Sequence, residues 1–126
     1  LFSIRFLRAR EPMKGTKMQQ VDKISVSNMG GYVFGFSIQW LSQDGTWNTT
    51  EWHSGNYPID QSRTSPELGS IGVPADALAV TPYGHAVAGT SGQGHAFVQY
   101  KAGANSVGTY NATGTTFINF AITLVG

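Results

Sequence analysis

The chain has 126 residues, of which 40% are apolar and 12% are charged, and its formal net charge at pH 7 is +1. That length favours a single domain with its own apolar core, and the composition excludes an intrinsically disordered chain. The absence of cysteine excludes disulfides, cysteine-ligated zinc and thiol catalysis. No apolar run reaches the roughly 18 residues that a transmembrane helix needs, so none is expected.

The charge is distributed unevenly along the chain. Residues 1–23 carry six basic and two acidic residues, a net charge of +4, whereas residues 24–126 carry two basic and five acidic residues, a net charge of −3. The sequence therefore predicts a basic N-terminal arm, residues 1–23, attached to a mildly acidic domain, residues 24–126. Such an arm can meet nucleic acid, a membrane surface or an acidic partner, and nucleic-acid binding is not expected elsewhere in the chain.

Two interpretations of the arm stay open. Residues 1–17 can be a non-native leader, with Met13 or Met18 as the natural start. Alternatively, the alternating apolar and polar residues 1–6 form a strand, which a neighbouring copy of the chain could accept at the edge of its sheet.

Alternation of apolar and polar residues predicts the first strands of the domain. Residues 23–28 form one strand, and Tyr32 to Trp40, with five large apolar side chains on one face, form the clearest one. The Asp44–Gly45 pair suits a type I′ hairpin turn, and residues 46–52 are expected to return as the partner strand.

The second half of the chain carries further short strands. Residues 53–77 are rich in turn-forming residues and predict a long loop, with a short strand or helical turn near residues 65–69. Further strands are expected in residues 77–84, closed by a Pro82–Gly84 turn, and in 85–88, 95–103, 106–116 and 117–126, the last with Ile118, Phe120, Ile122 and Leu124 on one face. The pattern predicts an all-β fold: a single antiparallel jelly-roll-like β-sandwich of about eight strands.

The glycine-rich segment Gly89–His95 resembles a phosphate-binding loop only superficially. It lacks the terminal Lys-Ser/Thr pair and is flanked by predicted strands, so the helix N-terminus that would bind an anion is missing. A hairpin tip is the preferred interpretation.

No catalytic or metal site is predicted. His85 and His95 begin adjacent predicted strands and could approach one another, but zinc would need a third ligand. There is no nucleophile elbow, and the five acidic residues of the domain form no evident pair for glycoside hydrolysis. We therefore expect neither an enzyme nor a cofactor.

The segment Trp47–Pro58 is the best candidate for a binding site because it combines aromatic and amide side chains with little charge. Aromatic rings can cover the apolar face of a sugar, while amides and carboxylates bond its hydroxyls. Alternation sends Trp47 and Trp52 to opposite faces, so one is expected in the core and the other, Trp52, at the surface. The candidate ligand-binding residues are Trp47, Asn48, Glu51, Trp52, His53, Asn56, Tyr57 and Asp60.

Several strings in residues 24–126 resemble a known protein family. They are "VSNMGGYVFGFSIQW", "SGN", "QSRT", "IGVPADA" and "GTYNATGTTF". Together they are similar to a family of small β-sandwich proteins that has bacterial members and whose named members rise in long-lived nematodes. The resemblance implies a jelly-roll-like sandwich and dimerisation, and it implies no catalytic residues.

These observations lead to a prediction of function with an alternative. The first hypothesis is a non-enzymatic, lectin-like module that binds a glycan, forms a homo-oligomer of two or more copies, and is secreted rather than cytoplasmic. The alternative is a structural or self-assembling protein that uses its N-terminal strand for contacts between copies. A membrane-active toxin would suit the aromatic loop, but a long amphipathic segment for insertion is missing.

Overall fold

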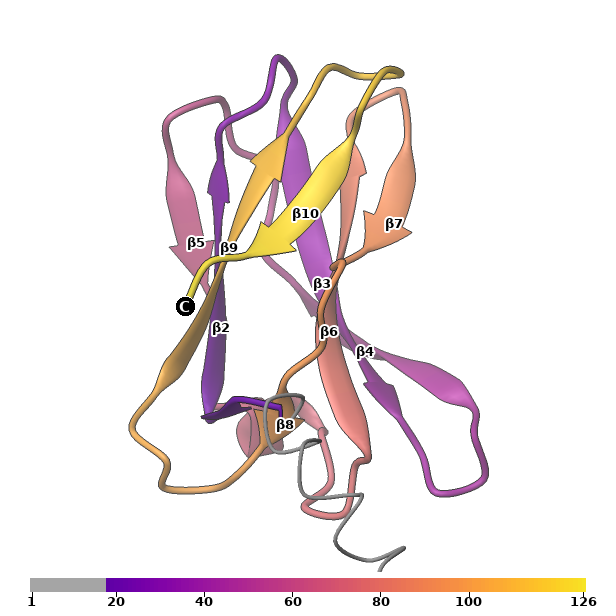
Figure 1. The fold of residues 1–126 in the computed structure, drawn as a ribbon, viewed down its shortest axis with the longest axis vertical. Coiled ribbons are helices and arrows are strands. Elements are labelled where there is room, and N and C mark those ends of the chain that lie inside the picture. The colour runs from indigo at the N-terminus through magenta and orange to yellow at the C-terminus, as the bar shows by residue number, and fades with distance from the viewer. Residues whose placement is uncertain (1–17) are drawn as a thin grey trace, which may run out of the picture.

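The computed structural model describes residues 18–126, which form two β-sheets of four strands each and a smaller parallel pair (Figure 1). The elements are β1 (Gln20–Val21), β2 (Lys23–Asn28), β3 (Phe34–Leu41), β4 (Trp47–His53), β5 (Ser62–Thr64), the 3-10 helix η2 (Leu68–Ile71), β6 (Ala79–Ala86), β7 (Ser91–Gln93), β8 (Gln99–Tyr100), β9 (Val107–Thr113) and β10 (Ala121–Leu124). The strand order is β10-β9-β2-β5 in one sheet and β4-β3-β6-β7 in the other. The predicted all-β class is confirmed.

The apolar core draws its side chains from both four-stranded sheets. Its largest fully buried members are Tyr57, Tyr110, Phe34, Phe36, Ile24, Ile38, Leu68 and Ile122. The sheets approach closely at Gly84 on β6, where a Cβ atom would lie 2.3 Å from Cζ of Phe34 and 2.8 Å from Cδ1 of Ile122. A glycine is therefore needed at this position, because a side chain here would collide with the Phe34 ring.

One strand pair departs from the predicted antiparallel arrangement. β2 and β9 pair in parallel along six residues, from Lys23 opposite Val107 to Asn28 opposite Ala112. Parallel neighbours need a long crossover connection rather than a hairpin, and most of the chain separates these two strands. The expectation of a wholly antiparallel sandwich is therefore wrong at this pair.

The predicted turn at Pro82–Gly84 is also wrong, because β6 continues through it to Ala86. The carbonyl oxygen of Pro82 accepts a hydrogen bond from the Gly94 N–H at 3.1 Å. In an antiparallel strand the backbone nitrogen and oxygen of one residue point toward the same neighbouring strand. The nitrogen of Pro82 therefore points toward β7, and its lack of an N–H removes no hydrogen bond between β3 and β6. The turn comes later, at residues 87–90, and Ser91–Gln93 of the predicted glycine-rich tip form β7.

The turn between β3 and β4 lies where the sequence predicts it but is of another type. Only Gly45 has a positive φ, of 85°, and the Ser42 N–H donates to the Thr46 oxygen at 2.9 Å. The Asp44 carboxylate accepts hydrogen bonds from the Ser42 hydroxyl and the Thr46 N–H. A type I turn followed by a left-handed glycine fits this pattern, whereas type I′ would need a second positive φ.

The last strand is shorter than predicted. β10 begins at Ala121, and the residues before it form a turn in which Phe117 is 75% and Ile118 is 66% exposed. Gly114 and Asn119, with φ values of 89° and 59°, open and close this turn. The alternation predicts Ile118 on the buried face with Ile122, and this prediction is wrong.

Residues 20–22, which the charge distribution assigns to the arm, contact the rest of the described chain. Val21 is fully buried in the core, and β1 pairs in parallel with β8. Asp22 is also buried, and its carboxylate accepts a hydrogen bond from the Asn105 N–H at 3.1 Å. The leader and the strand predicted for residues 1–6 lie outside the described residues.

Candidate binding face

The outward side of the β4-β3-β6-β7 sheet gathers polar side chains from all four strands. Cross-strand partners place Ser37 opposite both His53 and Tyr83, and Tyr83 opposite Gln93. Neighbouring strands lie about 4.8 Å apart, so this row spans about 14 Å. We call this surface the polar sheet face and define it as Ser37, Gln39, Thr49, Glu51, His53, Tyr83, His85, Ser91 and Gln93, with Trp47 at one end.

Side-chain hydrogen bonds hold the middle of the polar sheet face in place. Gln93 Nε2 donates to Gln39 Oε1 at 2.8 Å, and Gln39 Nε2 donates to Thr49 Oγ1 at 3.1 Å. The chain of bonds crosses the sheet from β7 through β3 to β4. Both amides therefore have defined orientations, and part of the cost of ordering them is met before any ligand arrives.

Two histidines and an asparagine meet above Gly35 at one end of the polar sheet face. The ring centroids of His53 and His85 lie 5.5 Å apart. A Cβ atom at Gly35 would lie 2.9 Å from His53 Cε1 and 2.6 Å from Asn56 Oδ1. The absence of a side chain on Gly35 thus makes room for the His53 ring and the Asn56 amide to lie across β3.

The hydrogen bonding of His53 sets its tautomer. The Gly55 N–H donates to His53 Nδ1 at 2.9 Å, so in the neutral ring the proton is on Nε2, which faces away from the backbone. Within residues 18–126, no group of three or more histidine, cysteine, aspartate or glutamate side chains is placed to hold a metal ion. The pair is suited to hydrogen bonding with a neutral ligand. The predicted approach of His85 to His95 is wrong, because His53 is the neighbour of His85.

His85 makes stability depend on pH in one direction. Partial burial, and secondly the neighbouring His53, lower the pKa of His85 below 6.5. A histidine with a lowered pKa binds fewer protons in the folded state, so its contribution to stability is complete above pH 6.5 and is lost as the pH falls from there toward its folded pKa. We expect the thermal midpoint to fall between about pH 7.5 and pH 5, and His85→Gln to flatten part of that fall.

His95→Gln is the matched control for this measurement, because His95 is exposed and lies outside the pair. It should leave the slope of the thermal midpoint against pH unchanged. An equal slope in the wild type and in His85→Gln would show that His85 does not titrate as described.

The structure brings together four of the eight predicted site residues. Trp47, Glu51 and His53 lie on the outward side of β4, and Asn56 lies beside His53. The register between β3 and β4 shifts at a β-bulge: β4 advances four residues from Thr49 to His53, while β3 advances two between Ser37 and Gln39. Because the difference is an even number, the alternation of faces along β4 is preserved. The predicted separation of the two tryptophans onto opposite faces is therefore confirmed.

The predicted exposure of Trp52 is wrong. Its ring packs edge-on against Phe36, with centroids 5.4 Å apart, and contacts the core. Trp47 is the outward tryptophan, packed edge-on against Phe97 at 5.1 Å. Asn48 shares the inward side of β4 with Trp52, and its amide donates to the Thr46 oxygen at 3.0 Å.

Tyr57 and Asp60 do not belong to the polar sheet face. Tyr57 is fully buried, its backbone pairs with that of Phe34, and its hydroxyl donates to the Val26 oxygen at 2.8 Å. Burial raises its pKa well above the usual range for tyrosine, and the guanidinium of Arg63 lies 4.8 Å from its ring centroid. Asp60 is exposed in the loop before β5, where its N–H donates to the Asn28 oxygen at 2.7 Å.

Seven residues of the polar sheet face were not predicted from the sequence: Ser37, Gln39, Thr49, Tyr83, His85, Ser91 and Gln93. Gln39 and Tyr83 follow from alternation once their strands are recognised, but the false turn at Pro82–Gly84 hid the second of these. The pairing of His85 with His53 depends on the register of three strands. A single sequence carries no direct signal of that register.

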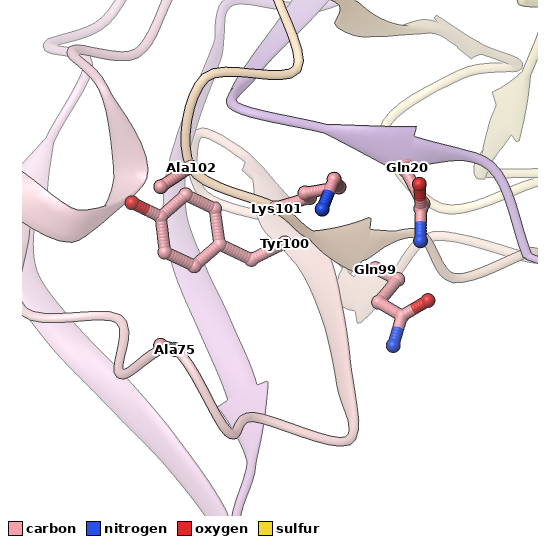
Figure 2. Close-up of a pocket in the computed structure, with 6 residues that line it drawn as sticks. All are labelled: Gln20, Ala75, Gln99, Tyr100, Lys101 and Ala102. Atoms are coloured by element: carbon pink, nitrogen blue, oxygen red, sulfur yellow. The ribbon is translucent and has the colours of Figure 1, made fainter.

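A pocket of about 340 Å³ lies at the η2 end of the molecule (Figure 2). It is lined by Gln20, Ala75, Gln99, Tyr100, Lys101 and Ala102. The Tyr100 hydroxyl donates to the Glu67 carboxylate, and that hydrogen bond raises the tyrosine pKa. The pocket contains none of the predicted site residues and offers one charged side chain, so the polar sheet face is the stronger candidate.

Comparisons with known proteins leave the family open. No protein-family model matches the chain, and no curated protein is similar to it. Three solved structures are similar over 82% of this chain: a Gram-negative toxin (17% identity, TM-score 0.44), the membrane-binding domain of pneumolysin (12%, 0.42) and listeriolysin O (16%, 0.35). The chain spans 22%, 95% and 22% of their respective lengths. Among residues 18–126, no helix has the length and apolar character to cross a membrane.

Proposed function

We propose that this chain is a non-enzymatic, lectin-like module that binds a glycan on the polar sheet face. The observation that carries the proposal is the row of imidazole, hydroxyl, phenol and amide side chains that His53, Ser37, Tyr83 and Gln93 place across four neighbouring strands.

The chemistry of this row suits a neutral sugar. Tyr83 and Trp47 present aromatic rings that can cover the apolar C–H face of a pyranose, and the amides and imidazoles can both donate to and accept from its hydroxyls. Glu51 supplies a carboxylate, a strong acceptor for a hydroxyl. The Gln93–Gln39–Thr49 hydrogen bonds reduce the entropy that binding would cost.

A glycan array probed with the full chain tests this proposal. We expect saturable binding to a related set of neutral glycans, weakened at least about tenfold by Tyr83→Ala, which removes a ring worth on the order of 1.5 kcal/mol. Thr123→Ala, on the other sheet, is the matched control and should bind like the wild type. The proposal fails if no glycan is bound, or if Tyr83→Ala folds and binds unchanged.

The remaining sequence predictions stay proposals with less support. Self-assembly would need an accessible sheet edge, and β4 is such an edge, but its bulge hinders pairing with another strand. The oligomer of two or more copies, the jelly-roll assignment and membership of the small β-sandwich family also stay proposals. A simple jelly roll is antiparallel, so the parallel β2–β9 pair disfavours that assignment.

A further inference from the structure

Most of the exposed large apolar side chains gather at one end of the molecule. Of the nine in residues 18–126, six lie in four loops at the end opposite η2: Met29, Val33, Ile59, Val87, Phe117 and Ile118. Figure 1 shows these loops side by side at the top, between β2 and β3, before β5, between β6 and β7, and between β9 and β10. We call these loops, residues 29–33, 54–61, 87–90 and 114–120, the loop end.

The loop end is almost free of charge. Its four segments contain no lysine, arginine or histidine and a single acidic residue, Asp60. Exposed apolar groups that gather in one region with so little charge mark surfaces that bind a partner. The lack of cations means that this partner is not selected by negative charge.

The backbone of the loop end is hydrogen-bonded between loops. The Gly31 N–H donates to the Gly114 oxygen at 2.9 Å, the Val87 N–H to the Val33 oxygen at 2.8 Å, and the Thr90 N–H to the Thr116 oxygen at 3.1 Å. These bonds hold three of the four loops, residues 29–33, 87–90 and 114–120, as one unit rather than as independent segments.

The turn between β9 and β10 is braced by hydrogen bonds of its own. The Thr115 N–H donates to the Ile118 oxygen at 2.9 Å, and the Ile118 N–H donates to the Thr115 hydroxyl at 3.1 Å. An apolar phase penalises every unpaired N–H and C=O. Both backbone groups of Ile118 are paired within the turn, which lowers the cost of placing the Phe117 and Ile118 side chains in such a phase.

We propose that the loop end docks on the surface of a zwitterionic lipid bilayer, with Phe117 and Ile118 inserted among the acyl chains. The two side chains are the most exposed large apolar side chains of residues 18–126, and the pocket of about 340 Å³ lies at the other end of the molecule. A fluid bilayer accepts protruding side chains without a matching cavity, and a lone carboxylate opposes an anionic surface but not a zwitterionic one. Two inserted side chains give reversible rather than permanent attachment.

Vesicle flotation with the full chain tests the proposal. We expect the protein to float with phosphatidylcholine vesicles, and Phe117→Ser combined with Ile118→Ser to weaken this partitioning at least about tenfold, because the change removes two large apolar side chains from the contact. The matched control is Leu78→Ser combined with Val125→Ser, two exposed apolar residues outside the loop end, which should float like the wild type.

A second vesicle composition separates the loop end from the basic arm. Flotation that requires added phosphatidylserine, and that persists in the Phe117→Ser and Ile118→Ser variant, would assign lipid binding to residues 1–23 and overturn the proposal. It would also be overturned if the wild type did not float with either vesicle, or if it were an oligomer in solution that this variant dissociates. The glycan test on the polar sheet face is independent of all these outcomes.

Discussion

Replacing Phe34 with alanine should lower the free energy of unfolding by about 3–5 kcal/mol, the range for removing a large aromatic side chain from a packed core. Phe34 is fully buried, and its ring makes an edge contact with Tyr57 at 5.7 Å and contacts Tyr32 and Phe120 at 6.1 and 6.4 Å. Gly84 faces this ring and has no side chain to move into the space. The cavity would therefore persist, and urea denaturation would measure its cost.

Phe117→Ala is the matched control, because it makes the same chemical change at a ring that is 75% exposed. Its effect on the free energy of unfolding should be within about 0.5 kcal/mol, as for other surface substitutions. A further check uses Gly84→Ala, which crowds the Phe34 ring in the wild type and should do less harm once Phe34 is alanine. Similar losses for Phe34→Ala and Phe117→Ala would contradict the described core.

The strands that could be predicted are those in which local alternation and burial agree. In β2 and β3, inward residues such as Ile24, Phe34 and Ile38 are apolar at every second position, so period 2 alone identifies them. β6 could not be found in full, because Pro82 and Gly84 are usual turn residues. Their place in a central strand depends on contacts with β7 and with the opposite sheet, which are distant in sequence.

The candidate site was predicted by composition and corrected by three-dimensional contacts. Aromatic and amide residues near Trp47 indicated the right strand. The direction in which each side chain of the loop after β4 points was not predictable. Tyr57 turns inward because its backbone pairs with Phe34 and its hydroxyl reaches Val26. A lone large aromatic residue within a Gly-, Pro- and Ser-rich loop is a signal that could have suggested such an anchor.

The exposed turn at Phe117 and Ile118 shows the opposite error. Alternation in residues 117–124 favours a strand with a buried face, and two positive φ values at Gly114 and Asn119 override it. Glycine and asparagine tolerate that conformation, so both residues were visible as turn signals. Apolar residues between two such signals are candidates for exposed loop tips. The exposed turn of the loop end is therefore partly predictable from the sequence.

The two tryptophans of β4 should differ in how much their removal destabilises the fold. Trp52→Ala should lower the free energy of unfolding by about 2–3 kcal/mol, somewhat less than for a fully buried tryptophan, because Trp52 packs on Phe36 and is only half-buried. Trp47→Ala should cost about 1 kcal/mol, the scale of its single aromatic contact with Phe97. Urea denaturation of both variants measures the difference.

Glycan binding should show the reverse order. Trp47 lies on the outward side of β4 with Glu51 and His53, so Trp47→Ala is expected to weaken a bound glycan about tenfold, the value of one aromatic contact. Trp52 faces the core, so Trp52→Ala should bind with unchanged affinity under conditions in which it is folded. Loss of binding in folded Trp52→Ala, with Trp47→Ala unaffected, would place the ligand on the inward side of β4 and refute a site on the polar sheet face.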